Sequence, residues 1–137
     1  MRESPTRILA TGAAVAADTE HEVTIGAAGD GKVYHIKSLH LVTANDVADQ
    51  SAFQITDADD AVIWQGTALT AIGTGALFFG AYRGIAAGFT DGLGGEVIVL
   101  PDNMIIPGGY KIKTVAELST SIDHGVLTVF GSVFKAL

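Results

Sequence analysis

Cysteine is missing from the sequence, and this absence excludes several chemistries at once. Without a thiol the chain cannot form a disulfide, bind zinc through thiolates or attack a substrate with a cysteine nucleophile. The absence also fits a reducing compartment. The 137 residues have the length of one ordinary domain, which buries roughly 65–70% of its unfolded surface and folds without metal or disulfide support.

Long apolar runs are also missing, although 48% of the residues are hydrophobic and the mean hydropathy is +0.39. The longest apolar stretches, Ala10–Ala17 and Glu96–Leu100, are far shorter than the roughly 20 residues that a membrane helix needs. Glu3 and Pro5 stand where a signal peptide would begin its apolar region. We therefore expect a protein that is neither secreted nor embedded in a membrane.

Basic residues are few, with eight Lys and Arg against fifteen Asp and Glu, and the formal net charge is −7. The eight are scattered along the sequence rather than clustered. Proteins that bind nucleic acid gather Lys and Arg, because much of their affinity comes from neutralising phosphates. We therefore expect no DNA or RNA partner, and an acidic exterior that favours solubility.

Strand patterns dominate the sequence from Glu20 onward. The predicted strands are His21–Ile25, Lys32–Thr43, Phe53–Thr56, Ala61–Trp64, Leu77–Tyr82, Glu96–Leu100, Tyr110–Thr114 and Val126–Phe134. Turn signals separate them, among them Asp30-Gly31, which suits a tight hairpin, and the acidic run Asp57–Asp60. About eight strands in this spacing predict an all-β fold, a jelly-roll-like antiparallel sandwich of two four-stranded sheets.

We expect residues 1–19 to form an extended N-terminal arm and residues 20–137 to form a single β-sandwich domain. The small side chains of Thr11–Ala17 bury little area, and the segment alone fits either a marginal helix or an extended strand. We favour an extended arm that lies on a partner subunit or on the domain itself. Deleting the residues before Asp18 is then expected to weaken docking and to leave the fold intact. Gly84–Gly95, with five glycines in twelve positions, is expected to be a long adaptable loop.

Jelly rolls include the cupins, whose histidines bind a metal, so this enzyme class is an alternative to be tested. Asp102, Pro107 and Gly109 follow the turn of the second cupin motif. Ile112 and Ala116, however, occupy the places of its histidine and asparagine, and the His-x-His pair of the first motif is missing. We therefore expect no cupin metal site.

The four histidines, His21, His35, His40 and His124, are expected to be separate surface or interface residues. His35 and His40 differ in parity along one strand, so they should point to opposite faces unless a bulge intervenes. They are therefore not expected to share a metal.

The acidic turn offers Asp57, Asp59 and Asp60, the clustered carboxylates that a hard cation prefers. It lacks the glycine and the distal glutamate of the calcium-binding helix-loop-helix motif, and Asp also caps its own backbone in turns. A solvated hairpin turn is the favoured interpretation, and a bound cation is the alternative.

Other constellations are weaker. Gly73-Thr-Gly75 lacks the third glycine of a dinucleotide fingerprint. The group from Ser119 to His124 surrounds one turn, whereas a catalytic triad is assembled from distant segments. The aromatic residues are expected in the core or a subunit interface, with Trp64 the best candidate for an exposed sugar-stacking platform. We predict no catalytic residue, no cofactor and no metal site, and thus a protein that is not an enzyme.

Three segments resemble the small jelly-roll proteins of tailed-bacteriophage virions, and capsid decoration (cement) proteins above all. They are the strand-turn-strand Thr24–Ile36, the Phe53–Trp64 hairpin, and Leu100–Tyr110 before a terminal strand that ends in Phe130-Gly131. The resemblance is one of overall style, so no functional residue is carried over from it.

This resemblance implies a structural virion protein, made in the host cytoplasm, that stabilises the capsid by bridging its subunits. Its partners would be the major capsid protein and further copies of itself, as a dimer or trimer, with no nucleic acid and no membrane. The alternative is a tail or fibre module, structural or receptor-binding, with a carbohydrate-binding sandwich. We expect partner contacts from the arm and the glycine-rich segment, at Arg7, Ile8, Leu9, Val15, Arg83, Phe89 and Leu93.

Overall fold

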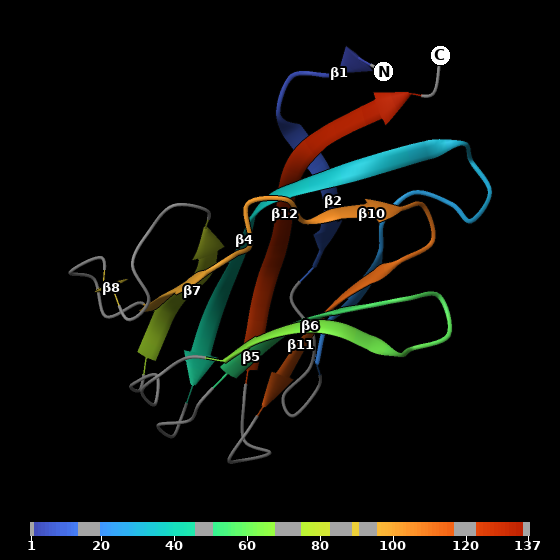
Figure 1. Cartoon of the computed structure of the whole chain (residues 1–137). Coiled ribbons are helices and arrows are strands. Elements are labelled where there is room, and N and C mark those ends of the chain that lie inside the picture. Colours follow the sequence, from blue (N-terminus) through green and yellow to red (C-terminus); the bar gives the residue numbers. More distant parts are fainter. Residues whose placement is uncertain are drawn as a thin grey trace.

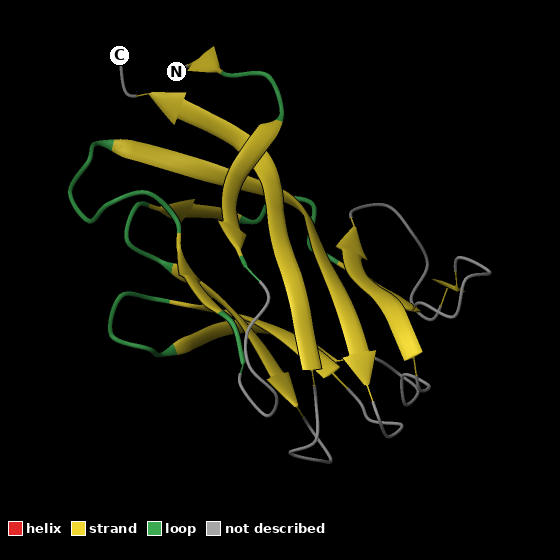
Figure 2. Cartoon of the chain, turned by 180° about the vertical axis from the view of Figure 1, so that it is seen from behind, coloured by secondary structure: helices red, strands yellow, loops and turns green. Residues whose placement is uncertain are grey.

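The computed structural model describes residues 2–13, 20–45, 51–67, 75–82, 89–90, 96–116 and 123–135. These residues form strands and turns and no helix, so this part of the chain has no helical segment of the length and apolarity that a membrane crossing needs. Two sheets pack face to face, which confirms the predicted all-β sandwich (Figure 1, and Figure 2 from behind).

Eight strands build the sandwich in the order of a jelly roll. Sheet A contains β2 (Arg7–Gly12), β12 (Asp123–Lys135), β4 (Lys32–Asn45) and β7 (Gly75–Tyr82), side by side in that order. Sheet B contains β3 (Glu22–Thr24), β11 (Lys111–Ala116), β5 (Ser51–Thr56) and β6 (Val62–Thr67). All neighbouring pairs within these two sets are antiparallel. The chain therefore moves repeatedly between the sheets, as in a double Greek key.

Four short strands extend sheet A beyond the four strands that form its part of the sandwich. They are β1 (Arg2–Glu3), β8 (Phe89–Thr90), β9 (Glu96–Val99) and β10 (Ile105–Pro107). β1 pairs with the end of β12, β10 pairs with the start of β4, and β9 lies parallel to β7 with β8 at its side. The sequence predicted β9, as Glu96–Leu100, but not the other three, because strands of two or three residues leave no readable alternation. The prediction of two four-stranded sheets was therefore wrong for sheet A.

The core fills the space between the sheets with alternate residues of the facing strands. Phe53 and Ile55 of β5, and Ile112 of β11, contribute the side chains of sheet B and are fully buried. Leu39 and Leu41 of β4 are equally buried on the side of sheet A. Each such side chain stabilises the fold by roughly 1.5–3 kcal/mol relative to an exposed position, so these residues hold the sandwich closed.

A β-bulge at Lys37 divides β4 into two halves. Ile36 pairs with Gly131 of β12 and Ser38 pairs with Phe130, so Lys37 has no partner in this register. Such an extra residue reverses which face the following side chains occupy. His35 packs against Phe134 and His40 against Phe130, which lie four residues apart on β12 and so share a face. The two histidines therefore lie on the same outer face of sheet A, and the prediction of opposite faces was wrong.

The turn at Asp30 joins the two sheets rather than closing a hairpin, because β3 belongs to sheet B and β4 to sheet A. The Asp30 carboxylate accepts hydrogen bonds from the backbone N–H groups of Ala27 and Lys32 and from the hydroxyl of Tyr34, at 3.2, 2.9 and 2.7 Å. Gly31 has a φ of 71°, a conformation that glycine adopts without steric cost. The expected tight turn is present, but its two strands do not pair.

Part of the expected arm lies on the domain itself, as strand β2 at the side of β12. Leu9 packs against the core, and Gly12 lies so close to the buried His21 that a Cβ there would meet the imidazole at 2.6 Å. Since β2 completes sheet A and covers part of the core, deleting the residues before Asp18 would also damage the fold. The structure therefore argues against the expectation that this deletion leaves the fold intact, and an unfolding measurement on the shortened chain would decide it.

Candidate functional site

A groove with an open volume of about 960 Å³ runs along the edge of sheet A where the two ends of the chain meet. We call it the terminal groove. Its lining contains five of the eight basic residues and one of the fifteen acidic ones: Arg2, Arg7, Lys32, Lys37, Lys135 and Glu3. The basic residues that are scattered in the sequence are therefore gathered by the fold, because β1, β2, β4 and β12 bring distant segments side by side.

Three of these cations form a row across neighbouring strands. Lys135 on β12 lies directly opposite Arg2 on β1 and, on its other side, directly opposite Lys32 on β4. Directly opposed residues of antiparallel strands project to the same side of a sheet, and like charges in this position destabilise it. The repulsion within this row therefore lowers the stability of the folded chain.

The single acidic residue of the groove is fully engaged. Glu3 Oε1 accepts a hydrogen bond from the Ser132 hydroxyl, lies 3.0 Å from Lys37 Nζ, and lies 3.4 Å from His35 Nδ1. The Ser132 hydrogen bond and the Lys37 ammonium group hold the pKa of Glu3 at about 2. His35 is also held from the other side, since its Nε2 donates to the Asp102 carbonyl at 2.9 Å. Glu3 thus neutralises Lys37, and within the described residues Arg2, Arg7, Lys32 and Lys135 form no ion pair.

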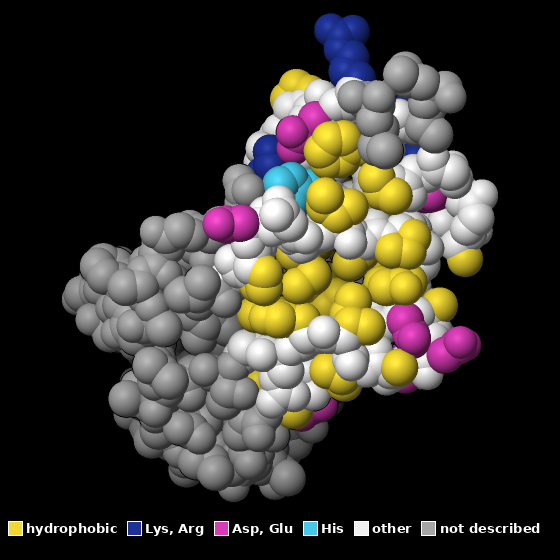
Figure 3. Space-filling view, viewed as in Figure 1, with side chains coloured by type: hydrophobic (Ala, Val, Ile, Leu, Met, Phe, Trp, Pro, Cys, Tyr) yellow, Lys and Arg dark blue, Asp and Glu magenta, His cyan; other side chains and the backbone are white. Residues whose placement is uncertain are grey.

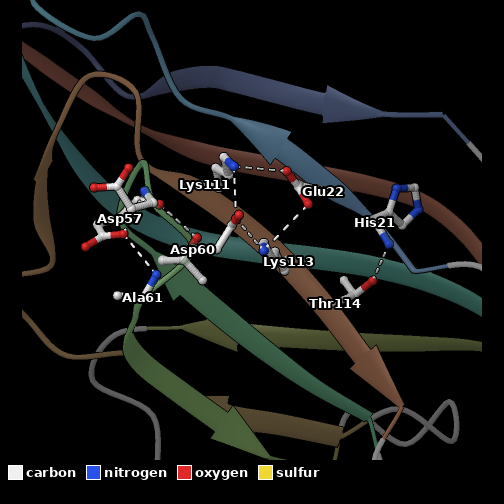
Figure 4. Close-up of polar contacts among 10 residues, drawn as sticks. His21, Glu22, Asp57, Asp60, Ala61, Lys111, Lys113 and Thr114 are labelled. Atoms are coloured by element: carbon white, nitrogen blue, oxygen red, sulfur yellow. Dashed lines mark hydrogen bonds and ion pairs between the residues drawn. The ribbon is translucent and has the colours of Figure 1, made fainter.

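The acidic turn between β5 and β6 lies at the projecting end of this hairpin, on the right in Figure 1. Asp57 Oδ1 accepts the backbone N–H groups of Asp59 and Ala61, each at 2.9 Å (Figure 4). Asp60, with a φ of 69°, places one carboxylate oxygen 2.9 Å from Lys111 Nζ and 2.7 Å from Lys113 Nζ. The turn is therefore held by contacts within the chain.

Both lysines beside Asp60 also face Glu22 of β3. The distances from Glu22 to Lys111 and Lys113 are 3.3 and 3.6 Å, so two carboxylates and two ammonium groups cross the outer face of sheet B (Figure 4). The hydrogen bonds from Lys113 and Lys111 lower the pKa of Asp60 to about 2, and Asp60 raises the pKa of both lysines. No three potential ligands among the described residues are grouped so as to hold a metal ion.

The histidines are less exposed than the sequence suggested. His21 is 3% exposed, and its backbone N–H donates to the Thr114 hydroxyl at 2.9 Å. His35 is 9% exposed between Glu3 and Asp102. Burial also lowers the pKa of His40 below its usual value of 6.5. The prediction of separate surface or interface residues was therefore wrong for His21 and His35, and the side chain of His124 lies outside the described residues.

Trp64 is half-buried and packs against the hydrophobic core, so it forms no exposed platform for sugar stacking. Among the predicted contact residues, Arg7 lines the terminal groove and Ile8 beside it is 54% exposed, whereas Leu9 is half-buried. The remaining predicted contacts, Val15, Arg83, Leu93 and the side chain of Phe89, lie outside the described residues, as does most of the glycine-rich segment.

The comparisons with known proteins find no family model, no curated protein and no solved structure that matches the chain.

Proposed function

We propose that the chain is a structural virion protein of a tailed bacteriophage, a capsid decoration protein that strengthens the shell by bridging its subunits. Its resemblance to such proteins over the strand-turn-strand and hairpin segments supports this function, and so does the jelly-roll-like sandwich itself. A fold alone does not define a function, and a surface feature of the molecule supports this one more specifically.

The observation that carries the proposal is the terminal groove. Four of its cations form no ion pair with the described residues, although the chain as a whole is strongly acidic. The acidic clusters around Asp57, Asp60 and Glu3, in contrast, bind the backbone and lysines of the chain itself. Within the described residues, these acidic groups thus serve the architecture of the chain itself, whereas the cations of the terminal groove form a surface that is suited to a partner. Charged side chains that are left available at a surface in this way are typical of a protein that binds other macromolecules.

The test is quantitative mass spectrometry of purified particles from the source, reported as copies of this chain per major capsid subunit. The proposal expects a ratio near one or a simple fraction of it. A handful of copies per particle would assign the chain to the tail or portal, and its absence from particles would refute a virion function. A tail protein of known low copy number, measured in the same sample, calibrates the two outcomes.

A further inference from the structure

Charge is strongly segregated on this molecule. The terminal groove has five cations and one carboxylate, a formal charge of +4, which leaves −11 on the rest of a chain whose total is −7. Figure 3 shows Lys and Arg side chains at the end where β1 lies, and acidic side chains at the right margin near the β5–β6 hairpin. The chain therefore has both a cationic surface and, well separated from it, an anionic one.

Among the described residues, no carboxylate forms an ion pair with Arg2, Lys135 or Lys32 of the cationic row. Glu3 is already shared by Ser132, His35 and Lys37. Asp30, whose pKa is lowered first by the Tyr34 hydrogen bond and least by the charge of Lys32, already accepts three hydrogen bonds. An anion from another molecule would thus relieve the repulsion within the row. Because such an anion would bind the folded chain and not the unfolded one, its binding would also stabilise the fold.

The β5–β6 turn has the properties of such an occupant. Residues 58–63 are all exposed, and the Asp59 carboxylate forms no hydrogen bond or ion pair with the described residues, while Asp57 and Asp60 stand on either side. Two apolar side chains follow the acidic ones, since Val62 is 52% and Ile63 is 49% exposed. The groove offers apolar surface beside its cations, at Pro5 and at the neighbouring Ile8. The two surfaces are complementary in charge and in apolar character.

We propose that the terminal groove of one copy receives the β5–β6 turn of a second copy of this chain. The two surfaces differ, so the contact is head-to-tail, and it closes into a ring when the rotation between copies permits. The partner at the groove is thus a second copy of the chain. This inference rests on the proposed function, because many copies bound to one particle meet at high local concentration.

The experiment is sedimentation velocity of the purified chain over a range of micromolar concentrations, at low and at high salt. We expect reversible self-association at low salt, and its loss at high salt, where charges are screened within a few ångströms. Lys135→Glu reverses the centre of the row, and Asp59→Lys reverses the turn. Each single variant should weaken association by about tenfold or more, as expected for close charge pairs at an interface.

The double variant Lys135→Glu/Asp59→Lys has the net charge of the wild type, with the charge of one residue reversed on each surface. It should regain association to within about threefold of the wild type, because the two changes are coupled only if the residues meet. Val126→Glu, on an exposed site toward the other end of β12, should associate normally although it adds one negative charge. Circular dichroism confirms that each variant is folded.

A wild type that stays monomeric at low salt overturns the inference, as does association that survives Lys135→Glu or is not restored in the double variant. Binding of a fluorescent oligonucleotide that is lost in Lys135→Glu, without self-association, would reassign the groove to nucleic acid and also overturn it. None of these results bears on the copy number in particles, so a failure here is distinguishable from a failure of the proposed function.

Discussion

Replacing Lys135 by glutamate is expected to make the isolated monomer more stable. In the wild type Lys135 has Arg2 on one side and Lys32 on the other, two opposed like-charge pairs in adjacent strands. Glutamate converts both into opposite-charge pairs. Cross-strand pairs contribute roughly 0.2–1 kcal/mol each, and the low end applies here because Lys135 is exposed. The gain in the free energy of unfolding should therefore be about 0.5–1 kcal/mol.

The assay is urea unfolding followed by tryptophan fluorescence, at a protein concentration low enough to keep the wild type monomeric. Trp64 is the only tryptophan and packs against the core, so it reports on the sandwich. The gain should appear at low ionic strength and shrink toward zero near 1 M salt, where the Debye length is about 3 Å. Lys135→Gln should give about half of the gain, since it removes repulsion without adding attraction.

Val126→Glu serves as the control, because it places a new negative charge toward the other end of the same strand. It should give no comparable gain. A Lys135→Glu protein that is less stable than the wild type at low salt would refute the argument, and a gain that is independent of salt would show that its origin is not electrostatic. Confirmation would mean that this edge of the sheet sacrifices stability for a binding surface.

Three further predictions concern the fold. Asp57→Ala removes the acceptor of two backbone N–H groups in the β5–β6 turn and should lower the free energy of unfolding in urea by about 1–2 kcal/mol. Asp57→Asn should lower it less, and an unchanged midpoint in the alanine variant would contradict the prediction. Gly131→Ala should cost about 2–3 kcal/mol, since the new Cβ would meet the His35 carbonyl oxygen at 2.1 Å, whereas Gly29→Ala, with open space around it, should cost less in the same measurement. The pKa of Glu3 is lowered from 4.5 to about 2, so its contribution is complete above pH 4.5 and is lost as the pH falls to about 2; Glu3→Gln should flatten the acid limb of the stability curve, and a curve parallel to the wild type would count against the Glu3 contacts.

Much of the fold could be predicted from alternation. Phe53 and Ile55 against Gln54 and Thr56 indicated a half-buried strand, and the structure buries both apolar side chains. The arm was harder to interpret, because the alanines and glycine near Leu9 contribute little area and no clear period. Its place depends on pairing with β12, at the other end of the chain. Local patterns do not contain that information.

The terminal groove could not be predicted for the same reason. Arg2 and Lys135 are separated by nearly the whole sequence, and nothing local indicates that they lie opposite one another. The contact of Glu3 with Ser132 is nearly as remote in sequence, and its contact with Lys37 also joins separate strands. Two signals were available in principle. The first and last strands of a jelly roll are neighbours, and these two segments of the sequence contain basic residues, Arg2 and Lys135 among them.

The bulge at Lys37 gives one strand two different roles. Before it, Val33 to His35 pair with the short rim strand β10, and after it, Ser38 to Asn45 pair with β7 inside the sheet. Loss of Lys37 itself would leave the other residues on their present faces, because Ile36 and Ser38 already lie opposite neighbouring residues of β12. Loss of a regularly paired residue of β4 would instead exchange inside for outside along the rest of the strand. Natural variants of this protein should therefore tolerate a one-residue deletion at Lys37 better than a deletion elsewhere in β4.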